Sequence, residues 1–203
     1  MSHPWEQAVR AFEEQAAVNP PPARAVVFAG SSTFTLWNSL PQDFPFVPVI
    51  NRGFGGSQMQ DLVVFADRVI NACRPRAVVV YSGDNDLAAG RTPEQVAGAA
   101  KGLLRKIRKG SGNIPVAFIG PKPSPSRRHL MKAFNETNEL LRALAASEEG
   151  VRYVDIRPVM LGPDGNPRPE LFGPDGLHMS RAGYEEWIRL LTPVIHEMAG
   201  TSP

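Results

Sequence analysis

Five short apolar runs recur along the chain. They are rich in Val, Ile and Phe, and they cover residues 25–29, 47–51, 77–81, 114–119 and 151–156. Runs of this length and composition, bounded by Gly, Pro and polar residues, are typical of strands that are buried on both faces. The pattern therefore predicts five buried strands.

The segments between these runs have apolar residues at helical spacing. Leu62, Phe65 and Val69 follow the second run, and a similar spacing follows each later run. A further amphipathic helix is expected over about residues 4–18, packed on the rest of the domain. Strands separated by whole helices need crossover connections, which place helices on both faces of a sheet. The predicted fold class is α/β, a three-layer αβα sandwich around a mostly parallel five-stranded sheet.

Composition and charge exclude several classes of protein. A length of 203 residues predicts a single domain over residues 1–203. The 22 Lys and Arg residues nearly balance 20 Asp and Glu residues, so the chain lacks the basic excess expected of a nucleic-acid partner. Cys73 is the one cysteine and the four histidines are scattered, which excludes a disulfide scaffold and a zinc finger.

The beginning of the sequence bears on localisation. Glu6, Arg10 and Glu13 interrupt the segment where a signal peptide would need an apolar stretch, and no run of 18 apolar residues occurs anywhere. We therefore expect a cytoplasmic protein without membrane insertion. The sequence does not indicate an oligomeric state.

Polar motifs follow three of the predicted strands, where open parallel sheets place their ligands. The first strand leads into Gly30-Ser31-Ser32-Thr33, and the second leads into a glycine cluster that includes Gly56. Asn85 follows the third strand, between two aspartates. Each motif alone is equally typical of a helix cap or a turn. The aspartates resemble a Mg²⁺ site, but no further carboxylate cluster accompanies them, so no metal is expected.

Near the C-terminus, Asp175 precedes His178 by three residues. This spacing lets the carboxylate fold back onto the imidazole Nδ1, which leaves Nε2 free to act as a base. The pair therefore indicates a catalytic histidine rather than a structural one.

These four motifs, taken in their order along the chain, resemble those of the SGNH hydrolases, also known as the GDSL esterase and lipase family. The resemblance extends from about residue 26 to residue 187. It implies a flavodoxin-like SGNH hydrolase fold and a serine hydrolase without a cofactor, whose partner is a small-molecule ester. One position departs from the family pattern, because Ser31 stands where the usual Gly-Asp-Ser motif has Asp.

The resemblance also implies a role for each matching residue. Ser32 is expected as the nucleophile, His178 as the base and Asp175 as the acid that orients it. The backbone N–H groups of Ser32 and Gly56 and the side-chain amide of Asn85 are expected to form the oxyanion hole.

Three alternatives stay open at this point. An α/β-hydrolase has the same chain order of Ser, Asp and His, but the sequence has no Gly-x-Ser-x-Gly elbow. A flavodoxin-like FMN-binding protein would use the serine-rich loop for a phosphate, but it leaves Asp175 and His178 unexplained. A non-catalytic ligand-binding protein is the third.

The family resemblance leaves the substrate open. Short-chain esters, lysophospholipids, thioesters and acetylated carbohydrates all occur as substrates in the family. The short loops of this small chain favour acyl groups from acetyl to butyryl, because they leave little chain for a lid over a lipid. Lys122, Arg127 and Arg128 are expected to form a solvated charged loop rather than a site for an acidic head group.

Overall fold

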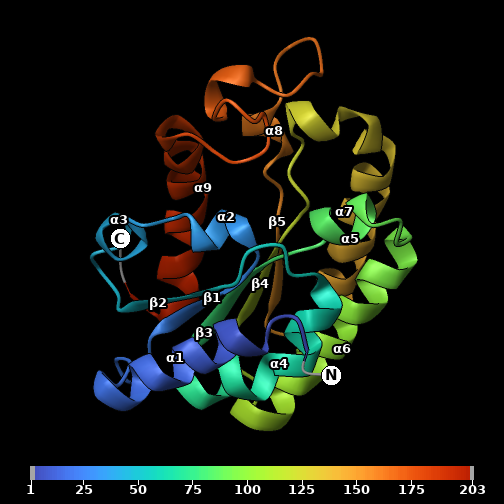
Figure 1. Ribbon diagram of the computed structural model, residues 1–203. Helices are drawn as coiled ribbons and strands as arrows, with labels where there is room; N and C mark the ends of the chain where they lie inside the picture. Colours follow the sequence, from blue (N-terminus) through green and yellow to red (C-terminus); the bar gives the residue numbers. More distant parts are fainter. Residues whose placement is uncertain (1–2, 202–203) are drawn as a thin grey trace.

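The computed structural model describes residues 3–201 and contains one five-stranded parallel sheet (Figure 1). The strands lie in the order β2-β1-β3-β4-β5. Their bounds are Val26–Gly30 for β1, Val49–Gly53 for β2, Ala77–Tyr81 for β3, Val116–Ile119 for β4 and Val151–Val154 for β5. The predicted α/β class and the five strands are confirmed, but the prediction that all five are buried is wrong for β5. This strand lies at the edge of the sheet, ends at Val154 rather than at residue 156, and has only Val154 buried. Every pair of neighbouring strands is parallel, and the strand order is that of flavodoxin-like folds.

Helices cover both faces of this sheet. The longer ones are α1 (Glu6–Val18), α4 (Met59–Val69), α6 (Pro93–Ser111), α7 (Met131–Ser147) and α9 (Arg181–Ala199). Apolar residues of α4, α6 and α7 pack on one face, and those of α9 pack on the other with two short helices, α2 (Ser32–Thr35) and α3 (Leu40–Asp43). The central strands are buried on both sides, which explains their uninterrupted apolar sequence.

Two strands begin later than the apolar pattern predicts. The run at residues 47–51 becomes a strand only at Val49, and the run at residues 114–119 only at Val116. Proline precedes both starts, Pro48 and Pro115, and proline has no N–H to donate to a strand ladder. Both prolines still contribute a carbonyl, which accepts a hydrogen bond from the strand alongside.

The short elements escape prediction from periodicity because they span too few residues. They include α5 (Asp84–Ala88), α8 (Arg157–Met160) and the 3₁₀ turns η1 (Asn71–Cys73), η2 (Pro125–Leu130) and η3 (Pro169–Leu171). Most of them follow the carboxyl ends of strands. Those that follow strands surround the predicted site, while Leu87 of α5 and Met160 of α8 also pack into the core.

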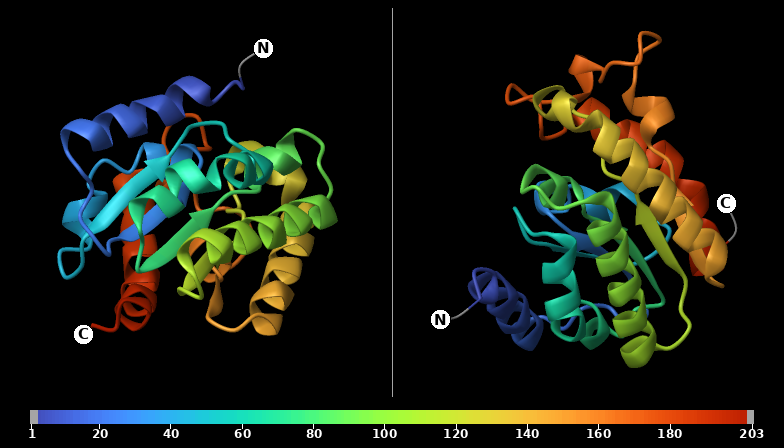
Figure 2. Two further views of the ribbon diagram at one scale, coloured as in Figure 1. Left: turned by 90° about the horizontal axis from the view of Figure 1, so that it is seen from below. Right: turned by 90° about the vertical axis from the view of Figure 1, so that its right-hand side faces the viewer.

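Helix α1 is the outermost layer of the molecule on the side of α4, as Figure 2 shows. The Arg68 guanidinium of α4 pairs with both Glu6 and Glu13 of α1, at 2.8 and 2.7 Å. Ahead of the helix, Trp5 donates from its indole nitrogen to Asp61 at the start of α4, at 2.9 Å. The N-terminal segment is thereby attached to α4 at two places.

The strand order also determines where a ligand can bind. Strand β1 has β2 on one side and β3 on the other, so the connections that leave β1 and β3 diverge at this point of the sheet. In open α/β sheets the crevice outside such a point is the usual binding site. No helix within residues 3–201 combines the length and the apolar composition needed to cross a lipid bilayer.

Candidate active site

The sharp turn from β1 into α2 places Ser32 at the start of the helix. A side chain at Gly30 would lie 2.2 Å from the Tyr81 carbonyl oxygen of β3, so only glycine fits at the end of β1. The Ser31 N–H then donates to the same carbonyl at 3.3 Å. Ser32 is therefore presented at the carboxyl end of the sheet, beside the crevice between the connections of β1 and β3.

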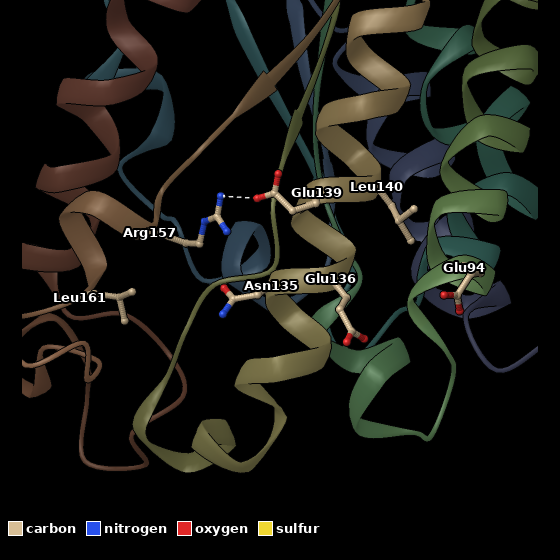
Figure 3. Close-up of a pocket in the computed structure, with 7 residues that line it drawn as sticks. All are labelled: Glu94, Asn135, Glu136, Glu139, Leu140, Arg157 and Leu161. Atoms are coloured by element: carbon tan, nitrogen blue, oxygen red, sulfur yellow. Dashed lines mark hydrogen bonds and ion pairs between the residues drawn. The ribbon is translucent and has the colours of Figure 1, made fainter.

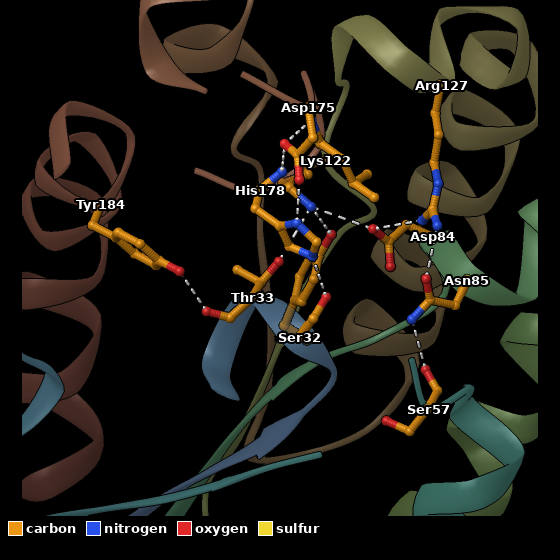
Figure 4. Close-up of polar contacts among 12 residues, drawn as sticks. Ser32, Thr33, Ser57, Asp84, Asn85, Lys122, Arg127, Asp175, His178 and Tyr184 are labelled. Atoms are coloured by element: carbon orange, nitrogen blue, oxygen red, sulfur yellow. Dashed lines mark hydrogen bonds and ion pairs between the residues drawn. The ribbon is translucent and has the colours of Figure 1, made fainter. Parts of the chain in front are cut away.

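Ser32, His178 and Asp175 form a continuous hydrogen-bonded chain (Figure 4). His178 Nε2 lies 3.0 Å from Ser32 Oγ, and His178 Nδ1 lies 2.6 Å from Asp175 Oδ2. A carboxylate can only accept hydrogen bonds, so the proton of a neutral imidazole resides on Nδ1 and Nε2 is left to accept from the Ser32 hydroxyl. The geometry is that of a nucleophile, a base and an orienting acid, although these roles remain predictions.

The loop that carries His178 keeps Asp175 ionised. The backbone N–H groups of Leu177 and His178 donate to Asp175 Oδ1, at 2.9 and 3.0 Å. The Leu177 N–H, the His178 ring and the His178 N–H together lower the pKa of Asp175 to about 2. The carboxylate is therefore charged throughout the neutral range, in which it can stabilise a protonated His178.

The structure distinguishes the two adjacent serines. The Ser31 side chain is buried, and its hydroxyl has no hydrogen-bond partner among residues 3–201. The Ser32 hydroxyl, by contrast, faces the His178 ring. Ser32 rather than Ser31 therefore has the contacts of a nucleophile.

The glycine loop after β2 lies directly against Ser32. The Phe54 N–H and the Ser57 hydroxyl both donate to the Gly30 carbonyl, at 2.9 and 3.3 Å, which fastens the loop to the end of β1. A side chain at Gly55 would lie 3.7 Å from the Ser32 Cβ. Gly56 adopts a φ of +81°, and a side chain there would lie 3.0 Å from the Trp5 ring.

Asn85 lies on the first turn of α5 and reaches the same loop. Its Nδ2 donates to the Ser57 carbonyl at 3.0 Å. Figure 4 shows Asn85 and Ser57 on one side of Ser32 and the pair of His178 and Asp175 above it. The structure thus brings all the sequence-predicted site residues to one end of the sheet.

The sequence analysis did not predict a buried ionic cluster that lies beside these residues. The Lys122 ammonium lies 3.3 Å from the Asp84 carboxylate, and both side chains are almost completely buried. Arg127 approaches the same carboxylate from the other side, with its Nη1 3.0 Å from Asp84 Oδ2. Burial raises the pKa of Asp84, but the charges of Lys122 and Arg127 outweigh burial and hold that pKa below its usual value.

The expectation of a solvated charged loop is therefore wrong for Lys122 and Arg127. The Lys122 ammonium also lies 3.2 Å from both the Thr33 hydroxyl and the Tyr81 hydroxyl. Arg127 is mostly buried, whereas Arg128 is exposed as expected. The amino-acid sequence alone does not show which charged residues pair when they are this far apart in the chain.

The two aspartates on either side of Asn85 serve separate partners. Asp84 faces the two cations, whereas both oxygens of Asp86 accept from the Met59 N–H at the start of α4, at 3.0 Å. Burial raises the pKa of Asp86 to about 6. The aspartates therefore support the architecture around Asn85, and they do not converge as a pair of metal ligands.

A separate groove of about 780 Å³ lies along α7 (Figure 3). Its lining comes from α6, α7, α8 and the residue after α8 rather than from the segments that carry Ser32, Asn85 and His178. Within it Arg157 pairs with Glu139 at 2.9 Å.

The sequence model of the GDSL-like Lipase/Acylhydrolase family matches residues 21–186. No curated protein is significantly similar in sequence.

Many solved structures share the fold. A provisionally assigned acylhydrolase from Bacteroides fragilis superimposes with a TM-score of 0.85 at 22% identity, covering 98% of this chain and 100% of that one. A GDSL-like lipase from Bacteroides thetaiotaomicron gives 0.79 at 20% identity, covering 93% and 97%. The family 3 carbohydrate esterase of Clostridium thermocellum gives 0.67 at 15% identity, covering 87% and 99%. At these identities the likeness establishes the fold.

Proposed function

Since the chain belongs to the GDSL-like lipase/acylhydrolase family, we propose that it is a serine esterase that hydrolyses a carboxylic ester through Ser32, His178 and Asp175. The hydrogen-bonded chain from Ser32 Oγ to His178 and on to Asp175 carries this proposal. An FMN-binding role would not explain the hydrogen bonds that join Ser32, His178 and Asp175. An α/β-hydrolase would need the Gly-x-Ser-x-Gly elbow, which the sequence lacks.

The first half of the reaction forms an acyl-enzyme. Ser32 Oγ attacks the ester carbonyl carbon while His178 Nε2 takes the hydroxyl proton. The ionised Asp175 stabilises the imidazolium that results. When the tetrahedral intermediate collapses, His178 returns the proton to the leaving alcohol, and the acyl group stays on Ser32.

The intermediate places a negative charge on the former carbonyl oxygen. The backbone N–H groups of Ser32 and Gly56 and the side-chain amide of Asn85 are the proposed donors to it. An amide nitrogen carries two hydrogens, so Asn85 can donate one to the Ser57 carbonyl and keep the second for the oxyanion. Removal of one such donor typically costs about 10²- to 10³-fold in rate.

The second half of the reaction releases the acid. His178 takes a proton from a water molecule, whose oxygen attacks the acyl carbon, and the same donors stabilise the second intermediate. Collapse of this intermediate breaks the bond to Ser32, which regains its proton from His178. The enzyme returns to its starting state.

Short acyl groups, from acetyl to butyryl, are the proposed substrates. The short elements around Ser32 leave little chain to cover a long acyl group. Acetylated carbohydrates form a second candidate class, favoured by the fold shared with the family 3 carbohydrate esterase of Clostridium thermocellum. Lysophospholipids and thioesters are the remaining family substrates.

The proposal is tested with p-nitrophenyl esters of acetate, butyrate and octanoate. We expect hydrolysis of acetate and butyrate to be faster than that of octanoate. Ser32→Ala should abolish most turnover, whereas Ser31→Ala, the adjacent control, should keep it because the Ser31 hydroxyl contacts none of the proposed groups. Full activity in Ser32→Ala would overturn the assignment of the nucleophile, and faster turnover of octanoate would overturn the substrate preference.

A further inference from the structure

The oxyanion amide of Asn85 has a second partner in Arg127, on the opposite side from Ser57. Arg127 Nη2 donates to Asn85 Oδ1 at 2.9 Å (Figure 4). The other terminal nitrogen of the guanidinium lies 3.0 Å from Asp84 Oδ2. Arg127 thus bridges the buried Asp84 carboxylate and the Asn85 side-chain amide, which the proposed reaction uses.

The chemistry of these groups permits one orientation of the Asn85 amide. A guanidinium has five N–H donors and no acceptor, so only the amide oxygen can face it. The amide nitrogen must then point the other way, toward the Ser57 carbonyl and the glycine loop. A flipped amide would set its NH₂ against the guanidinium and its oxygen against the Ser57 carbonyl, which breaks both hydrogen bonds.

The position of Arg127 is itself fixed by the buried ionic cluster. Asp84 is shared between Arg127 and Lys122, and the Lys122 ammonium also contacts Thr33, the residue after the proposed nucleophile. Arg127 comes from the turn η2, yet Asp84 ties it to α5 and, through Lys122, to β3 and α2. The guanidinium is therefore held from the side away from Asn85.

The same turn also contacts the loop that carries His178. The Ser126 N–H donates to the Gly176 carbonyl at 3.0 Å. A side chain at Gly176 would lie 3.2 Å from Pro125. Residues 125–127 therefore link the loop of the acid and base with the amide of the oxyanion hole.

We propose that Arg127 is a positioning residue, which holds the Asn85 amide with its N–H groups toward the oxyanion. The positively charged guanidinium, which donates to Asn85 Oδ1, also draws electron density from the amide and makes the amide N–H groups stronger donors. This inference rests on the proposed esterase function. It assigns Arg127 an effect that passes through Asn85 and involves no contact with the substrate.

A double-mutant cycle tests the proposal with Asn85→Ala, Arg127→Met and the combination of both. The readouts are kcat and KM for p-nitrophenyl acetate and the labelling rate with a fluorophosphonate, whose oxygen occupies the oxyanion position. We expect Asn85→Ala to lower kcat by about 10²- to 10³-fold and Arg127→Met by about 10- to 10²-fold, with KM almost unchanged. The combined variant should be no slower than Asn85→Ala alone, because Arg127 then has no amide to position.

Two further variants separate positioning from folding. Arg128→Met removes the neighbouring exposed arginine and should leave both readouts unchanged. If the thermal midpoint shows that Arg127→Met does not fold, Arg127→Lys replaces it in the cycle. It keeps a charge for Asp84, but a single ammonium cannot reproduce the two-sided contact, so it should also slow the reaction only when Asn85 is present.

The outcomes are distinct. If the two fold-losses in kcat multiply in the combined variant, or if a folded Arg127→Met protein has wild-type kinetics, the positioning role is overturned while the proposed esterase function is retained. Absence of hydrolysis and of labelling in the wild-type chain would overturn the proposed function, and this inference with it.

Discussion

At the scale of single residues, Asp175 decides which nitrogen of His178 carries the proton. The carboxylate accepts from Nδ1 at 2.6 Å, which leaves Nε2 to accept from Ser32. An amide in its place could donate to Nδ1 and so favour the imidazole tautomer with its proton on Nε2. The base would then be blocked, although the loop around it could keep its shape.

Asp175→Asn should therefore lower kcat by about 10³- to 10⁴-fold with little change in the thermal midpoint, because an asparagine oxygen can still accept from the backbone N–H groups of Leu177 and His178. Steady-state hydrolysis of p-nitrophenyl acetate measures the effect. Retention of more than a tenth of the wild-type kcat would show that the acid is dispensable for the base.

Asp86 gives a prediction for stability against pH. Burial raises its pKa in the folded protein from 3.8 to about 6, so its contribution to stability is fully present below pH 3.8 and is lost as the pH rises through 6. A shift of this size corresponds to about 3 kcal/mol. Asn can accept from the Met59 N–H in the same way without carrying a charge.

Asp86→Asn should accordingly be close to wild type in unfolding free energy near pH 4 and more stable than wild type, by up to about 3 kcal/mol, near pH 7. Urea unfolding at the two pH values measures the difference. If the difference in unfolding free energy between the variant and the wild type does not grow with pH, burial does not destabilise the ionised Asp86 carboxylate.

Residue spacing in the sequence indicates some of these groups and conceals others. Asp175 and His178 lie three residues apart, so their pairing follows from local geometry. Asp84, Lys122 and Arg127 come from separate connections, and charged residues in a proline-rich loop look solvated when their partners are unknown. The buried ionic cluster could therefore not be predicted, although each of its three residues is a charged residue near a predicted strand end.

At the scale of elements, the glycine loop after β2 depends on the N-terminal segment. Gly56 has a φ of +81°, which disfavours any residue with a side chain, and its open side faces the Trp5 ring. Trp5 is in turn fixed by Asp61 at the start of α4. The conformation of the proposed oxyanion donor is thus supported by Trp5, the residue before α1, and through it by α4.

Gly56→Ala should cost about 1–2 kcal/mol in unfolding free energy from the positive φ and should also lower kcat, because a methyl group 3.0 Å from Trp5 displaces the loop. Gly200→Ala is the matched control, since Gly200 has a φ of +62° with open space around it at the end of α9. Both variants should lose stability in chemical unfolding, and only Gly56→Ala should lose activity. Equal activities would remove Gly56 from the site.

The elements differ in how far the sequence predicts them. Five runs rich in apolar residues suffice to predict the five strands, and the runs are uninterrupted in β1 and β3 because these central strands are buried on both faces. The short helices α2 and α5 span four and five residues, too few for a helical period, yet they carry Ser32 and Asn85. Their presence depends on how each strand ends, which tertiary contacts decide.

At the scale of the whole molecule, the strand order assembles the site. Ser32 and His178 are 146 residues apart in sequence, and only the folded sheet brings them within hydrogen-bonding distance. Ser32 follows β1 and Asn85 follows β3, at the point where the connections of the sheet diverge. The contact between Ser32 and His178 is therefore a property of the native fold and not of the local sequence.

The central claim is that the fold activates Ser32, and the most direct test is reaction with a serine-directed fluorophosphonate followed by intact-mass measurement and peptide mapping. We expect a single adduct on Ser32 in the native protein, none after prior denaturation, and none in the His178→Ala variant. An adduct on Ser31, or a native protein that stays unlabelled, would contradict the claim.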